Sequence, residues 1–225
     1  MSEREPEMSM RKLSILLAGF TMGVLVLMVI TGVITGATQE KHEHFMFPEQ
    51  YAVSLLGEAK GLRILMALDI AFLILYTAFF AAFTKYLRAI GRPFAMLGFG
   101  AMLATAILDI IEDHHIISML ESVEHRVLPS AAMIQLQAAE SAVKFSMSFL
   151  ALVFYGLAVP RTTKLGLALC LFLTVGTLVS GVLGYAAPPD MQAKLESGRW
   201  VGFLIGFALS IAWLRAAPEP DAAKA

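Results

Sequence analysis

The stretch 94–115, FAMLGFGAMLATAILDIIEDHH, decides the fold of this chain. Residues 94–108 carry no charged side chain, and three carboxylates and two histidines follow at once in Asp109-Ile110-Ile111-Glu112-Asp113-His114-His115. An apolar run of this kind is typical of a membrane-spanning helix. Ionisable groups at such a position are costly unless they are paired or used, so the same stretch indicates where a functional site lies.

The composition of the whole chain is that of a membrane protein. Of its 225 residues, 58% are hydrophobic and only 16% are charged, whereas about 25% are charged in soluble domains. The mean hydropathy is +0.72. The net charge of -1 shows no basic excess, so no nucleic-acid partner is expected. The single cysteine, Cys170, cannot form an intramolecular disulfide.

Apolar runs long enough to cross a bilayer, about 20 helical residues, recur along the chain. They predict an all-α, polytopic integral membrane protein with six transmembrane helices, at about residues 13–37, 62–83, 94–112, 139–159, 165–187 and 200–214. The first run exceeds the roughly 7 to 15 residues of a signal-peptide core, so it is interpreted as an uncleaved span. Residues 1–12 form an N-terminal tail, and residues 216–225 are expected to be a disordered C-terminal tail.

Basic residues are distributed unevenly between the two sides of the predicted bundle. Both tails and the connections 85–92 and 160–164 together hold ten Lys and Arg, whereas the longer connections opposite hold six. By the positive-inside rule, both termini are predicted to be cytoplasmic, and the location to be a bacterial cytoplasmic membrane. In the outer loop 38–61, residues 49–60 are expected to form a separate helix on the membrane surface. In the outer loop 116–135, the third helix is expected to continue, with Pro129-Ser130 opening the fourth.

Three charged residues on consecutive spans share one depth. At 1.5 Å per residue, Asp69, Asp109 and Lys144 lie about 5 to 10 Å beneath the outer surface, so the three side chains can meet. Glu112 and Asp113 lie one helical turn from Asp109, and Gln137, Ser141 and Ser148 extend a polar stripe along the fourth helix. The predicted intramembrane polar cluster comprises Asp69, Asp109, Glu112, Asp113, Glu140 and Lys144. It is either an architectural network or the lining of an outward-facing pocket for an ion, a proton or a polar lipid head group.

All five histidines fall on the outer side. Glu112 and His115 have the Glu-x-x-His spacing of carboxylate-bridged metal sites, although the second copy that such sites need is absent. Histidine with carboxylate suits a divalent metal such as Zn, Fe, Mn or Cu, whereas ordinary snorkelling of interfacial side chains is the alternative. Haem is not expected, because no two spans carry histidines at matching depth. The candidate metal ligands are His114, His115, Glu112, His42 and His44.

Small residues recur every fourth position in three of the spans, a spacing that lets helices approach closely. They favour packing inside the bundle, and otherwise a homo-oligomer or a partner membrane subunit. The stripes are Gly19 with Gly23, Gly32 with Gly36, Gly176 with Ser180 and Gly184, and Gly198 with Gly202, Gly206 and Ser210.

The sequence leaves three functions open. The leading hypothesis is a membrane protein that binds an ion, a metal or a polar lipid group in the outward-facing pocket, as a transporter with titrating carboxylates. The second is a membrane-embedded metalloenzyme acting on a lipid-like substrate at the outer leaflet, and the third is a non-catalytic subunit or assembly factor. No Walker loop, Gly-x-Ser-x-Gly elbow, His-Glu-x-x-His or Cys-x-x-Cys occurs, so catalytic residues are not assigned.

Overall fold

The computed structural model describes residues 8–186 and 189–217, without the side chains of Tyr185 and of residues 189–197. The described chain is all-helical, contains no strand, and has six helices long and apolar enough to cross a membrane, which confirms the predicted class and number of spans. Arg4, Lys224 and most of the predicted disordered tail lie outside the described residues. The elements are α1 (Met10–Thr35), η1 (Glu40–Glu43), α2 (Pro48–Ala89), α3 (Phe94–Glu124), α4 (Ala131–Ala158), α5 (Lys164–Leu171), η2 (Phe172–Gly176), α6 (Thr177–Ala186) and α7 (Pro189–Ala216).

Short polar side chains begin several of these helices. Ser9, Ser130 and Thr163 stand at the N-caps of α1, α4 and α5, and each accepts a hydrogen bond from a backbone N–H in the first turn, at 3.4, 3.2 and 3.0 Å. These bonds satisfy donors that have no partner within the helix. Gly36, with a φ of 71°, ends α1 in the left-handed conformation, and its N–H donates to the Gly32 carbonyl at 2.8 Å.

Residues 49–60 are helical as predicted, but they do not form a separate helix, so that part of the prediction is wrong. Those residues form the first turns of α2, which begins with Pro48 at its N-terminus and runs unbroken for 42 residues. No proline interrupts the chain between Pro48 and Ala89, so nothing forces a break where the apolar span begins. The continuation of the third helix is confirmed, because α3 extends to Glu124, and α4 starts after Ser130 as predicted.

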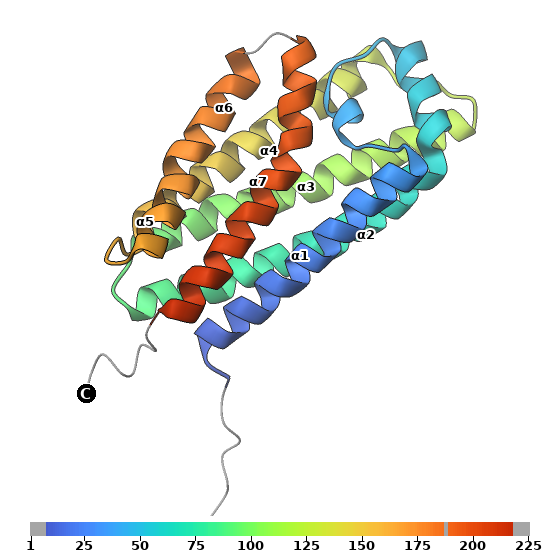
Figure 1. Ribbon diagram of the computed structural model, residues 1–225. Helices are drawn as coiled ribbons and strands as arrows, with labels where there is room; N and C mark the ends of the chain where they lie inside the picture. The colour runs from blue at the N-terminus through green and yellow to red at the C-terminus, as the bar shows by residue number, and fades with distance from the viewer. Residues whose placement is uncertain (1–7, 187–188, 218–225) are drawn as a thin grey trace, which may run out of the picture.

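The spans form one bundle in which neighbours in sequence are neighbours in space (Figure 1). Helix α1 packs on α2, α2 on α3, and α3 on α4, which in turn contacts α5, η2 and α6. Helix α7 packs on α1, α5 and α6 and so closes the ring. The described ends of the chain lie at one end of the bundle, and η1 lies at the other. We call the end that carries η1 the outer end.

The two halves of the bundle interior differ in chemistry. Towards the chain termini the interior is aromatic: Phe79 stacks on Phe83 with ring centroids 5.4 Å apart, and Phe207 meets Phe79 edge-on at 5.3 Å. The Trp213 ring packs edge-on against Phe83 at 5.9 Å. The buried charged side chains of the spans lie in the outer half. The terminal half therefore supplies rigid packing, and the outer half holds the polar groups.

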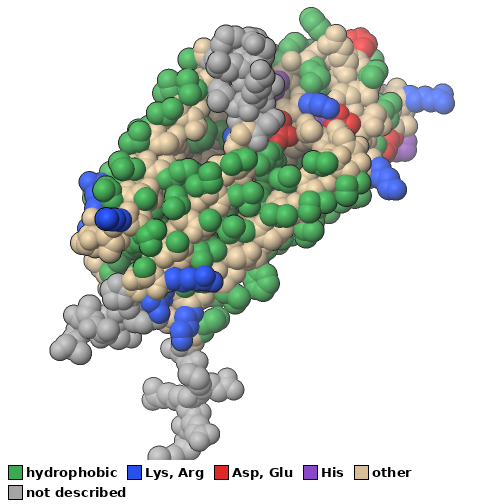
Figure 2. All heavy atoms as spheres, in the orientation of Figure 1, with side chains coloured by type: hydrophobic (Ala, Val, Ile, Leu, Met, Phe, Trp, Pro, Cys, Tyr) green, Lys and Arg blue, Asp and Glu red, His purple; other side chains and the backbone are tan. Residues whose placement is uncertain are grey.

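Acidic side chains on the surface are distributed unevenly along the same direction. Figure 2 shows Lys and Arg at both ends of the bundle, whereas the acidic side chains in view lie towards the outer end. Among the described side chains, no Asp or Glu lies at the terminal end. Its described basic residues are Arg11, Lys12, Lys85, Arg88, Arg92, Arg161, Lys164 and Arg215.

Close helix packing involves glycines outside the predicted stripes as well as one within them. A Cβ added at Gly61 would meet Ala37 Cβ at 2.5 Å, and one at Gly98 would meet the Tyr155 ring at 3.0 Å. In the stripes, a Cβ at Gly206 would meet Phe172 at 3.3 Å. No described atom lies within 4 Å of a Cβ built at Gly19, Gly23, Gly184, Gly198 or Gly202. Gly19 and Gly23 are exposed, so the predicted packing of this stripe inside the bundle is wrong: spacing alone does not say which face of a helix meets its neighbour.

Candidate functional site

Lys144 on α4 stands at the centre of the polar cluster. Its Nζ donates to Asp109 Oδ1 at 2.9 Å and to Glu112 Oε2, both on α3. All three residues are buried, with relative exposures of 5%, 7% and 0%. The structure therefore joins Asp109 and Lys144, which the sequence placed at one depth, and adds Glu112 to the same ammonium group.

Glu112 is held by the polar stripe of α4. Ser141 and Gln137 both donate to its Oε1, Gln137 from 3.2 Å, and Gln137 Nε2 also lies 3.1 Å from Ser141 Oγ. Gln137, Ser141 and Lys144 fall on one face because their spacing of three to four residues is one helical turn. Hydrogen bonds from two neutral donors and one ammonium stabilise a carboxylate in this position.

The other two buried carboxyl groups, those of Asp69 on α2 and Asp113 on α3, lie beside each other and beside Asp109. Tyr76 donates to Asp109 Oδ2 at 3.2 Å, and Gln39 donates to Asp113 Oδ1 at 3.1 Å. Asp113 Oδ2 is buried and accepts no hydrogen bond from the described residues. Two ionised carboxylates cannot donate to each other, so a proton or a cation between Asp69 and Asp113 would stabilise this side of the cluster.

The cluster has an excess of acidic groups. Asp69, Asp109, Glu112 and Asp113 have relative exposures of 7% or less, and Lys144 is the one basic residue among the buried charged residues described. Burying a carboxylate without a partner costs several kcal/mol. The arrangement is therefore suited to taking up protons or a small cation.

The segment 36–47, which we call the cap segment, closes the outer end of the cluster. Its Glu43 accepts from Arg199 of α7 at 2.7 Å, and its Glu40 accepts from the Trp200 indole. Lys41 pairs with Glu58 of α2 at 2.6 Å. The cap segment is thus attached to α7 and α2, and Gln39 connects it to Asp113.

His42 is buried in the cap segment, with a relative exposure of 0%. Its Nδ1 lies 3.1 Å from the Thr38 carbonyl, its Nε2 lies 3.2 Å from Ser54 Oγ, and its ring meets Tyr51 edge-on at 5.4 Å. Burial lowers the pKa of His42 below the ordinary histidine value of 6.5. Both ring nitrogens are engaged, so His42 positions the cap segment.

The structure does not gather the predicted metal ligands. Glu112 faces Lys144, whereas His115 turns away and its Nδ1 lies 2.7 Å from Glu140 Oε2. His114 and His44 are exposed, and His114 Nδ1 bonds the Ile110 carbonyl at 2.8 Å. Within residues 8–186 and 189–217, no group of three or more His, Cys, Asp and Glu side chains is arranged to hold a metal ion. Glu140, predicted as a member of the cluster, pairs with His115 instead of with Lys144.

Sequence reasoning missed several partners of the cluster. Tyr76 lies seven residues after Asp69, two turns along the same face of α2, so helical periodicity could have found it. Gln39, Glu43 and Arg199 carry no such signal, because loop conformation and packing of the cap segment on α7 bring them to the cluster. A comparison with protein-family models, curated proteins and solved structures finds no match to this chain.

Proposed function

We propose that the protein binds and releases protons, or a small cation in their place, at Asp69, Asp109, Glu112, Asp113 and Lys144, and that it uses this exchange for transport across the membrane. The observation that carries the proposal is the burial of four carboxyl groups around a single ammonium group. Intramembrane ionisable residues in this number commonly mark ion or proton pathways.

The reaction class follows from the balance of charge. Lys144 contacts Asp109 and Glu112, whereas Asp69 and Asp113 lie together without it. A proton shared between Asp69 and Asp113 would remove part of the negative excess, and a cation bound there would do the same. Release of one on uptake of the other is the elementary step of a proton-coupled exchanger.

We also propose that both termini face the cytoplasm of a bacterial inner membrane. More of the described basic residues lie at the terminal end than at the outer end, and no described acidic residue lies at the terminal end, which agrees with the positive-inside rule. In this orientation the cluster lies nearer the outer surface, with the cap segment between it and the external solution. The cation or proton would enter from that side.

Proton release by the purified protein tests the binding step. The protein in detergent, in weakly buffered solution, is titrated with NaCl, LiCl, KCl or MgCl₂ while the pH is followed. Wild type is expected to release about one proton per molecule on saturation by the preferred cation, because a cation and a proton compete for the same carboxylates. Asp69→Asn and Asp113→Asn are each expected to abolish the release.

Glu49→Gln is the matched control, because Glu49 is an exposed carboxyl at the start of α2 and its substitution should leave the release unchanged.

The transport step is tested with protein in lipid vesicles that enclose a pH-sensitive dye, under a gradient of the cation that displaced protons. Vesicles with the wild-type protein are expected to change their internal pH, whereas vesicles with the Asp69→Asn variant are expected to keep theirs. A wild-type protein that neither releases protons nor moves them would leave only an architectural role for the cluster.

A further inference from the structure

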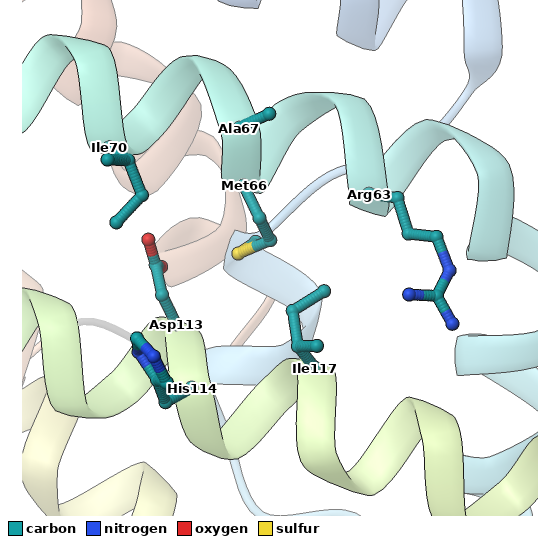
Figure 3. Close-up of a pocket in the computed structure, with 7 residues that line it drawn as sticks. All are labelled: Arg63, Met66, Ala67, Ile70, Asp113, His114 and Ile117. Carbon is teal, nitrogen blue, oxygen red and sulfur yellow. The ribbon is translucent and has the colours of Figure 1, made fainter.

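A shallow groove of about 280 Å³ lies between α2 and α3 near the outer end of the bundle (Figure 3). Met66, Ala67 and Ile70 of α2 and Ile117 of α3 form its apolar walls, and Asp113 and His114 of α3 supply its polar groups. Figure 3 shows the Asp113 side chain directed from α3 towards α2, between Met66 and Ile70. Because α2 and α3 are neighbours in the ring, the groove opens sideways, towards lipid.

Asp113 and His114 each offer the groove a hydrogen-bond acceptor. Asp113 is 3% exposed and lies beside the Asp69 carboxyl, and its Oδ2 accepts no hydrogen bond from an N–H group of the part of the chain that the structure describes. His114 Nδ1 lies 2.8 Å from the Ile110 carbonyl. A carbonyl only accepts, so Nδ1 carries the hydrogen and Nε2 of the neutral ring is an acceptor. Arg63 at the edge of the groove donates to Glu124 at 2.7 Å, so its charge is already paired.

We infer that this groove binds the primary ammonium head group of a membrane lipid. The ammonium N–H groups would donate to Asp113 Oδ2 and His114 Nε2, and the methylene groups and acyl chain of the same lipid would pack on Met66, Ile70 and Ile117. The charge is complementary, because the carboxyl groups beside Asp113 exceed the basic groups. The depth also fits: Asp113 lies one turn beyond Asp109, at the predicted level where head groups meet acyl chains.

A lipid with an ammonium head group matches both the polar and the apolar side chains of the groove. An inorganic cation would satisfy the carboxylate but would leave the four apolar side chains without a partner. A lipid head group with a quaternary amine has the charge but no N–H to donate. The inference rests on the proposed function because Asp113 belongs to both the polar cluster and the groove. Substitutions in the groove walls change the groove alone, so they test lipid binding separately from proton exchange.

The test uses the purified protein in a one-to-one mixture of phosphatidylethanolamine and phosphatidylcholine, with retained lipid identified by native mass spectrometry. The two lipids share the phosphate and the chains but differ in the N–H donors. Wild type is expected to retain the ethanolamine lipid with about tenfold preference, the factor that one charge-assisted hydrogen bond contributes. Asp113→Asn and Ala67→Phe are each expected to reduce the preference to about one.

Ala67→Phe fills the groove from an exposed position and leaves every carboxyl group in place. It should therefore lose lipid selectivity while it keeps the proton release described above, which distinguishes failure of this inference from failure of the proposed function. Ile74→Phe is the matched control, because Ile74 is 60% exposed on α2 and does not line the groove. Equal retention of both lipids by wild type, or a preference that survives Ala67→Phe, would overturn the inference.

Discussion

At the scale of single residues, Lys144 balances the charge of the outer half of the bundle. It contacts Asp109 and Glu112 at relative exposures that leave little water around any of the three. Its removal would leave two carboxyl groups without an ammonium donor in a medium of low polarity. The surrounding hydrogen bonds from Ser141 and Gln137 would compensate only in part.

Lys144→Met is therefore expected to lower the free energy of unfolding by about 3 to 5 kcal/mol, the range for breaking a buried ion pair from one side. The double variant Lys144→Met with Asp109→Asn is expected to recover part of that loss, because it removes one unpaired charge. Cys170 is a buried free thiol, so its reaction with a fluorogenic maleimide on heating reports unfolding. If the double variant lost as much free energy of unfolding as the two single variants together, the contact between Lys144 and Asp109 would contribute nothing to stability.

His42 makes the cap segment sensitive to pH. Burial lowers the pKa of His42, so the folded cap segment holds the ring neutral where the unfolded chain would already bind a proton. The stabilisation is fully present above about pH 6.5, the ordinary value. It is lost as the pH falls through that value towards the lowered pKa, and no further loss follows below it.

His42→Gln is expected to remove this part of the pH dependence. The midpoint of thermal unfolding should fall between about pH 7.5 and pH 5.5 by less in the variant than in wild type, because glutamine does not titrate there. Carboxyl groups elsewhere titrate in both proteins, so the difference between the two is the quantity to compare. A variant with the same pH dependence as wild type would contradict the role assigned to His42.

At the scale of elements, the hairpin of α1 and α2 depends on one glycine. The added Cβ at Gly61 would lie 2.5 Å from Ala37 Cβ and 2.6 Å from Thr35 Oγ1. Both neighbours lie at the end of α1, where the cap segment begins. The absence of a side chain at Gly61 thus determines how closely α2 approaches the start of the cap segment.

Gly61→Ala is expected to destabilise the protein by about 1 to 3 kcal/mol, the usual cost of overpacking. Gly57→Ala is the matched control one turn earlier in the same helix, since no described atom lies within 4 Å of its added Cβ. That substitution should stabilise α2 by about 0.5 to 1 kcal/mol, because alanine is the better helix former. Thermal unfolding of the two variants should therefore shift in opposite directions, and shifts of the same sign would contradict this packing.

At the scale of the whole molecule, the spans place the chain termini at one end and the cap segment at the other. The described charged side chains at the terminal end are all basic, whereas the outer end carries both basic and acidic side chains. Such an asymmetry orients a bundle during insertion. Access to the cluster from outside the cell depends on that orientation.

Labelling of single cysteines in bacterial cells tests the orientation. In a Cys170→Ala background, Glu49→Cys at the outer end is expected to react with a membrane-impermeant maleimide in intact cells. Arg88→Cys at the terminal end should react only after the membrane is permeabilised, because both positions are exposed and differ only in side. The reverse pattern would place the termini outside and would invert the proposed direction of access.

The sequence by itself determined the helical class, the number of spans and the level at which polar side chains collect. These follow from the length and spacing of apolar runs, because about 20 residues of helix cross a bilayer whatever their neighbours are. It also identified Asp109, Glu112 and Lys144, because charges inside a span are costly wherever the span lies.

Only the tertiary structure decided which of these groups meet. The rotation of α3 against α4 turns Glu112 towards Lys144 and His115 towards Glu140, which separates the Glu-x-x-His pair. The folding of the cap segment brings Gln39 to Asp113 across 74 positions of sequence. Helix rotation and loop conformation depend on packing between segments that are distant in sequence. The spacing of residues within one segment does not determine that packing.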